Sequence, residues 1–147
     1  MTRSTATRGR TIRPGLVLLL LFLTTGCATA PPSSMADARV SGTVTYRERI
    51  ALPPDAVLEV ALLDTSRMDV AAIVLAEQRI DSPGQVPVSF SLAYDPARID
   101  PRMSYAVRAT IRVDDRPLFV TDRAWPVLTR GHSERVDVVL VRSARTE

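Results

Sequence analysis

Apolar and polar residues alternate along most of the chain from Arg39 onward. In the first stretch, Val40, Gly42, Val44 and Tyr46 alternate with polar residues, which is the period-two pattern of a strand with one buried face. Comparable stretches follow at residues 57–63, 73–80, 86–94, 105–113, 118–122 and 136–140. The pattern predicts about seven short strands and no long helix.

Turn-forming residues separate these stretches. Residues 82–84, 114–116 and 130–132 favour tight turns, and residues 95–101 favour a proline-bounded corner with one helical turn. The stretch at 73–80 also fits a helix, but we favour a strand because it is short and contains β-branched residues. Pro87 favours an edge position or the start of a strand for residues 86–94.

This arrangement predicts an all-β fold. Short strands at regular spacing with turn signals between them are typical of a small β-sandwich or a partly open barrel. In the stretch at 105–113, the alternation directs Arg108 and Arg112 to the face opposite the apolar one.

Residues 1–26 have the three parts of a bacterial signal peptide. The first 13 residues carry four arginines and no acid, and residues 16–23 form an apolar run. A membrane-spanning helix needs about 20 apolar residues. The run is much shorter, so we expect export and cleavage rather than a permanent helical anchor.

Gly26 and Cys27 directly follow the apolar run. A small residue before cysteine at this place is typical of a lipobox, in which Cys27 receives acyl chains such as palmitate and cleavage falls between Gly26 and Cys27. Thr24 departs from the pattern, which favours leucine there. The alternative is release by cleavage after residues 28–30 (ATA), which Pro31 disfavours because it lacks the N–H at the scissile bond.

Residues 27–38 comprise the predicted lipidated cysteine and a flexible linker rich in Ala, Pro and Ser. The predicted domain spans residues 39–143, and residues 144–147 form a tail. Ala28, rather than aspartate, follows Cys27. By analogy with enterobacterial sorting, this favours the outer membrane, with the domain on its periplasmic face.

The charge distribution argues against nucleic-acid binding. The formal charge is +3, but four of the 19 basic residues precede Cys27, which leaves 15 basic residues against 16 acidic ones. Those basic residues alternate with acids along the chain. Neutralising phosphates requires clustered cations, so we expect no nucleic-acid partner.

No catalytic or metal-binding constellation is evident in the sequence, and we expect neither enzymatic activity nor a cofactor. The single histidine, His132, stands in a predicted turn, and Asp114 and Asp115 fit a hairpin loop better than a calcium loop. Three residues are candidates for partner binding: Trp125, Arg108 and Arg112. For each of them we favour the simpler alternative, which is core packing for Trp125 and solvation for the arginines.

Short segments in one order along residues 40–142 resemble the YbaY family of bacterial lipoproteins. They are residues 41–56, 58–60, 63–64, 90–96 (FSLAYDP), 99–101, 105–109 (YAVRA) and 121–122. The family is grouped with the YscW-type lipoprotein chaperones of type III secretion, the pilotins, which escort a secretin subunit of the outer membrane. The resemblance implies a non-enzymatic β-sandwich lipoprotein and transfers only Cys27, as the acylated position.

We therefore expect a membrane-anchored, periplasm-facing lipoprotein that acts as a binding or chaperone module, pilotin-like toward a secretin-like envelope protein. A peptide added to an edge strand, with residues 86–94 as the candidate edge, is the natural binding mode. The alternative is a structural or stress-related cell-envelope lipoprotein with no dedicated client.

Overall fold

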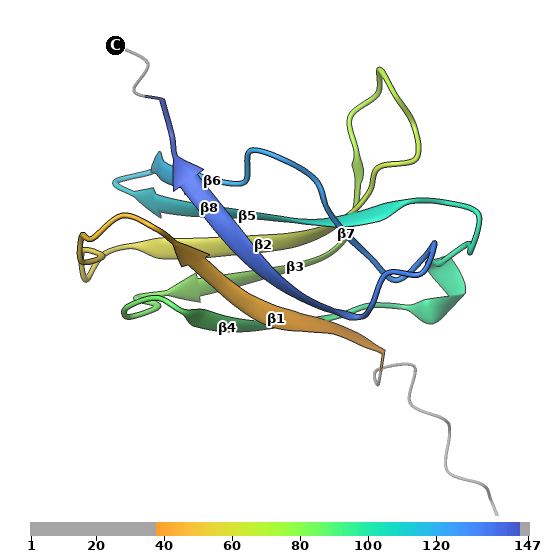
Figure 1. The fold of residues 1–147 in the computed structure, drawn as a ribbon, viewed down its shortest axis with the longest axis horizontal. Coiled ribbons are helices and arrows are strands. Elements are labelled where there is room, and N and C mark those ends of the chain that lie inside the picture. Colours follow the sequence, from red (N-terminus) through yellow and green to blue (C-terminus); the bar gives the residue numbers. More distant parts are fainter. Residues whose placement is uncertain (1–37, 145–147) are drawn as a thin grey trace, which may run out of the picture. The chain divides into compact units, whose positions relative to one another are not determined.

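A computed structural model describes residues 38–144, which form an eight-stranded sheet and one short 3-10 helix, η1 (Pro96–Arg98) (Figure 1). The order of strands in the sheet is β3-β2-β5-β6-β8-β1-β4, and β7 also pairs with β5. In chain order, the strands are β1 (Arg39–Tyr46), β2 (Val57–Asp64), β3 (Ile73–Asp81), β4 (Val88–Ala93), β5 (Tyr105–Val113), β6 (Arg116–Val120), β7 (Trp125–Val127) and β8 (Arg135–Arg142).

The sheet curls until its two terminal strands, β3 and β4, lie near each other. The Ser91 N–H of β4 donates to the side-chain oxygen of Gln78 in β3 at 2.9 Å, and the Arg98 guanidinium reaches the Leu75 carbonyl at 3.5 Å. The sheet is therefore a nearly closed barrel. This confirms the predicted all-β class, in the form of the partly open barrel.

The barrel interior is filled by the apolar residues that alternate along the strands. Tyr46 and Phe119 stack there with their ring centroids 4.1 Å apart and their planes 3° from parallel. The fully buried side chains are Phe119, Leu58, Leu62, Leu92, Ile111, Leu140, Val40, Val44, Val60, Val107, Val127 and Val138. They come from seven of the strands, so burial of one shared core holds the sheet in its curled form.

Most of the predicted elements are present. Residues 73–81 form a strand, the 95–101 corner contains one 3-10 turn, and the hairpin at Asp114 and Asp115 places both residues at positive φ, as a two-residue turn requires. β7 was not predicted as a separate strand. It has only three residues, one of them Pro126, so it shows no measurable alternation.

Gly42 of β1 marks the closest approach between strands. β1 pairs with β8 in parallel, and a side-chain Cβ built at Gly42 would overlap the backbone carbonyl of Val136. Beside this contact, the Asp137 carboxylate accepts from both the N–H and the hydroxyl of Thr43, at 3.2 and 2.8 Å. Because backbone atoms cannot move aside cheaply, only glycine fits at this position.

We expect Gly42→Ala to lower the free energy of unfolding by about 3 kcal/mol, at the upper end of overpacking costs. Ser41→Ala, at the neighbouring half-exposed position, should stay within about 0.5 kcal/mol of the wild type. Urea unfolding of both variants measures the difference. Equal stabilities would show that β8 does not approach β1 this closely.

One end of the barrel gathers three loops and the first described residue; we call it the proximal end. Ala38 lies there because its carbonyl accepts from the Tyr94 N–H at 3.0 Å. Asp64, Tyr105 and Val127 lie side by side in neighbouring strands, so the segments beyond them share this end. These segments are the β2–β3 hairpin loop (65–72), the β4–β5 corner (95–104) and the β7–β8 turn (128–134).

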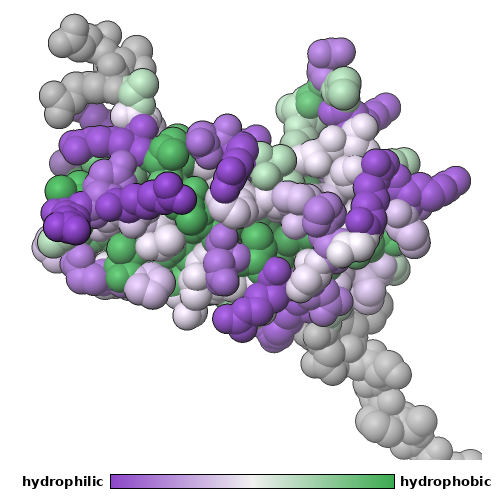
Figure 2. Space-filling view, in the orientation of Figure 1, coloured by the Kyte–Doolittle hydropathy of each residue, from purple (hydrophilic) through white to green (hydrophobic). Residues whose placement is uncertain are grey.

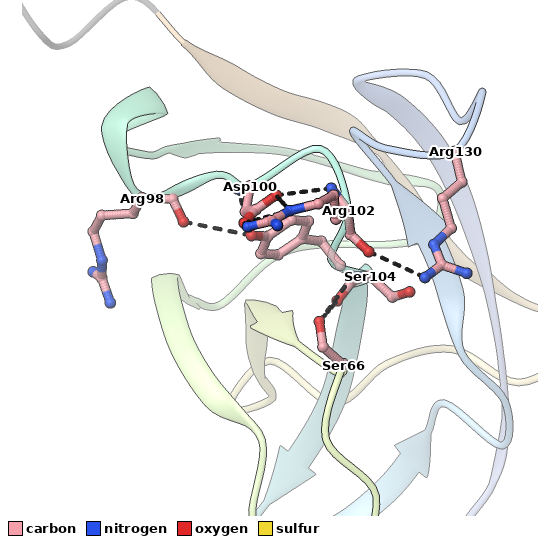
Figure 3. A network of polar contacts seen from close by, with 7 residues as sticks. Ser66, Arg98, Asp100, Arg102, Ser104 and Arg130 are labelled. Carbon is pink, nitrogen blue, oxygen red and sulfur yellow. Dashed lines mark hydrogen bonds and ion pairs between the residues drawn. The ribbon is translucent and has the colours of Figure 1, made fainter.

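Polar contacts fix the corner at the proximal end (Figure 3). The Tyr105 hydroxyl accepts from the Asp100 N–H at 2.9 Å and donates to the Arg98 carbonyl at 3.5 Å. The Asp100 carboxylate pairs with Arg102 at 2.7 Å, and Arg130 donates to the Arg102 carbonyl at 3.1 Å. The hydrogen bond and ion pair with Arg102 lower the pKa of Asp100 from 3.8 to about 2.

The lowered pKa of Asp100 predicts how the stability of the fold depends on pH. Since ionised Asp100 is favoured in the folded state, its contribution to stability is complete above about pH 4 and is lost as the pH falls toward 2. Carboxyl carbon chemical shifts should give Asp100 a pKa near 2 in the wild type and a higher one in Arg102→Ala, which loses the guanidinium but keeps the backbone N–H bond to the carboxylate. A wild-type pKa near 3.8 would contradict the pairing.

Candidate functional site

A hollow of about 560 Å³ lies on the outer face of β3, β2 and β5. All of its lining residues except Val60 and Gln78 alternate with the core positions and face outward, so it is open to solvent. The lining residues are Glu59, Val60, Ala61, Glu77, Gln78, Arg79, Arg108, Thr110 and Arg112. Both of the arginines predicted to face outward, Arg108 and Arg112, are among them.

The register of the three strands explains the shape of the hollow. Ala61 of β2 lies between Glu77 of β3 and Arg108 of β5. Side chains at directly opposed positions stand about 5 Å apart, and the methyl group of Ala61 is much shorter than its two neighbours. The longer side chains therefore rise on either side of a low floor.

Two of the three arginines are held by Glu59. This carboxylate pairs with Arg79 at 3.2 Å and with Arg112 at 2.9 Å. Arg79 also pairs with Asp81 at 3.0 Å, and Arg112 donates to the Asp115 carbonyl at 3.0 Å. These contacts are solvent-exposed, so their role is to fix the side chains more than to stabilise the fold.

Arg108 differs from its two neighbours. Its side chain is exposed, and it has no hydrogen bond or ion pair within residues 38–144. With Arg79 and Arg112 already engaged by Glu59, it is the cation of the hollow that remains available to a ligand. Guanidinium groups bind carboxylates through paired N–H donors, so the hollow can recognise an acidic side chain or a chain terminus.

Trp125 lies away from the hollow. It is opposite Val107 in the β5–β7 pair, on the inward face of the sheet, and is half-buried against the core. The Arg123 guanidinium covers its ring at 4.4 Å from the centroid, and its indole N–H has no acceptor within the described part of the chain. The structure therefore brings Arg108 and Arg112 together but separates Trp125 from them.

The predicted edge at residues 86–94 corresponds to β4, a terminal strand of the sheet that begins directly after Pro87. The Ser91 N–H on this strand is already bonded to Gln78, so the gap beside β4 is partly filled. The other terminal strand, β3, borders the hollow. The hollow is therefore better placed than the β4 edge to receive a partner segment.

Sequence reasoning did not find Glu59, Ala61, Glu77 or Arg79 as parts of a site. Their positions on the outer faces of β2 and β3 follow from alternation, but their meeting with β5 depends on strand order. An available signal was the interruption of the apolar pattern in β2 by a carboxylate at Glu59.

His132, the single histidine, is exposed in the β7–β8 turn, where its backbone N–H donates to the Thr129 carbonyl at 3.0 Å. Within residues 38–144, no group of three or more His, Cys, Asp or Glu side chains is arranged to hold a metal. The same residues contain no helix of the length and hydropathy that a bilayer crossing needs. Gly26 and Cys27 lie outside the described residues.

Comparisons with known proteins agree with this fold. Residues 35–140 match the family model described as type III secretion system lipoprotein chaperone (YscW). An uncharacterised lipoprotein of Escherichia coli strain K12, YbaY, is 40% identical over 120 residues, which cover 81% of this chain and 62% of the relative. The chain thus spans less than two thirds of that relative's length.

A solved structure is also similar. An alternative pilotin from the type II secretion system of Vibrio cholerae superposes with a TM-score of 0.70 at 39% identity. The match covers 73% of this chain and 97% of the pilotin chain.

Proposed function

Because the chain belongs to the family of type III secretion system lipoprotein chaperones (YscW), we propose that it is a lipid-anchored binding module for a secretin-like envelope protein. The observation that carries the proposal is the hollow on β3, β2 and β5, in whose wall Arg108 has no side-chain partner from the described part of the chain. The match to a pilotin structure supports a client that belongs to a secretion system.

The chemistry of the hollow defines the segment it would bind. Arg108 stands on the β5 side of Ala61 and Glu77 on the β3 side, so a bound segment would meet a guanidinium along one edge and a carboxylate along the other. A segment with an acidic residue toward β5 fits this arrangement. The low floor at Ala61 leaves room for a side chain between them.

The anchor would be provided by Cys27. Acyl chains on this thiol would hold the domain at the periplasmic face of the outer membrane, where secretin subunits assemble. Two or more chains are needed for stable attachment, since each buried methylene contributes about 0.8 kcal/mol. A binding module held at that surface meets a membrane-bound client at high effective concentration.

We expect Cys27→Ala to lose the acyl mass and its attachment to membranes. Detergent extracts of native membranes should yield an acylated wild type that co-purifies with a secretin subunit, while the variant is recovered from the soluble fraction. Intact-mass analysis of the same samples provides the check. An acylated wild type without a specific partner would instead support the structural envelope role, and an unacylated wild type would contradict the anchor.

Charge reversal tests the hollow directly. Arg108→Glu should reduce recovery of the secretin subunit about tenfold or more, because a charge-assisted hydrogen bond contributes about 1.5–3 kcal/mol and would be replaced by repulsion. Arg116→Glu is the matched control, since Arg116 is also exposed but lies in β6, outside the hollow. Equal losses, or no loss in either variant, would show that the hollow is not the client surface.

A further inference from the structure

Exposed apolar side chains gather on the β2–β3 hairpin. Met68 is 88% exposed, Val70 57%, Ile73 49% and Val74 48%. Figure 1 shows the hairpin projecting from the barrel, and the space-filling view shows a protrusion there on which hydrophobic and hydrophilic residues adjoin (Figure 2). We call Met68, Val70, Ile73 and Val74 the hairpin patch.

The hairpin is held in this position by its base. The Ser104 N–H donates to the Ser66 hydroxyl at 2.8 Å (Figure 3). The Thr65 N–H donates to the Ser104 carbonyl at 2.9 Å. The backbone N–H of Ser66 also donates to the Asp64 carboxylate at 2.9 Å. These hydrogen bonds hold the base of the hairpin against the β4–β5 corner. The tip extends away from the base, and its apolar side chains lie outside the core.

The position of the chain's anchor segment points to the occupant of the hairpin patch. The start of β1 and the base of the hairpin both lie at the proximal end of the barrel, although the hairpin projects from the upper side in Figure 1 and β1 begins on the lower side. Ten residues separate Cys27 from Ala38, and a chain of this length spans at most about 36 Å when fully extended. An anchored domain would consequently keep its proximal end close to the bilayer at all times.

The charges near the hairpin patch fit the surface of a bilayer. The side chains of Arg67, Arg98 and Arg130 are exposed at the proximal end, while the exposed Arg102 is already paired with Asp100. The hairpin tip also carries one exposed carboxylate, Asp69, between Met68 and Val70, which would stay at the level of the headgroups. Guanidinium groups bind phosphate oxygens through paired donors. Apolar side chains next to exposed cations are the combination by which peripheral proteins enter the boundary between lipid headgroups and acyl chains.

We propose that the hairpin patch inserts into the headgroup region of the membrane that carries the acyl anchor. This rests on the proposed acylation of Cys27. Because the acyl anchor already holds the domain at the membrane, the hairpin patch meets the lipid at high effective concentration. A few apolar side chains are therefore sufficient for insertion. It fixes the proximal end against the lipid and leaves the hollow, which lies further along the same strands, accessible to a client.

Spin labelling of the full-length acylated chain tests the proposal. Since Cys27 is consumed by acylation, a nitroxide would react only with a new cysteine, placed at Met68→Cys or, as the matched control, at exposed Asp55→Cys in the β1–β2 loop at the other end. The probe membrane is a vesicle of phosphatidylethanolamine and phosphatidylglycerol. Accessibility to oxygen and to a water-soluble nickel complex reports the depth of the label.

The label at position 68 should lie about 5–10 Å below the headgroup surface, with the label at position 55 in water. Adding Val70→Asp should return the label at position 68 to water without unfolding the domain, because Val70 is outside the core. Equal aqueous exposure at both positions would overturn the proposal. So would protection that appears only at high protein density, or only with the secretin subunit present, since the occupant would then be a second copy or the client.

Intact-mass analysis of the labelled samples separates the two proposals. An acylated chain with an aqueous label at position 68 overturns the membrane contact alone. A chain without acyl mass overturns the anchor and, with it, this inference.

Discussion

The parallel pairing of β1 with β8 joins the first and last strands of the barrel, and the closure of the barrel depends on it. β8 is the strand that links β1 and β4 to the remainder of the sheet through its short pairing with β6. Gly42 permits the approach because the Val136 carbonyl occupies the space of a side chain. Without this junction, β4 would not reach β3, and the shared core that curves the outer face would not form.

Side chains on the two faces of the curved sheet have different roles. Inward positions build a core in which Tyr46 stacks on Phe119, while outward positions on β3, β2 and β5 are free to carry charge. The hollow follows from a small residue, Ala61, placed between long charged ones. Glu59 holds two arginines in place, and Arg108 has no side-chain partner among residues 38–144, which is the arrangement that the proposed surface for an acidic segment requires.

The sequence predicted those features that depend on one strand alone. The outward direction of Arg108 and Arg112 follows from alternation in β5, and the hairpin at Asp114 and Asp115 follows from residues that tolerate positive φ. The hollow depends on β2 lying between β3 and β5, which no local pattern specifies. Trp125 was a candidate for partner binding because it is the single tryptophan, and core packing was the favoured alternative. Its inward position depends on the pairing of β5 with β7, a strand too short to show alternation.

The proposed anchor, client surface and membrane contact are compatible with one another. The proximal end would face the membrane, and the hollow would lie along the strands beyond it. Client binding at the hollow is tested most directly with a photoactivatable cross-linker at Thr110, on the wall of the hollow, in the acylated protein within native membranes. We expect a cross-link to a secretin subunit from Thr110 and none from the same cross-linker at exposed Arg116. Cross-linking from Arg116 but not from Thr110 would show that the client binds elsewhere than at the hollow.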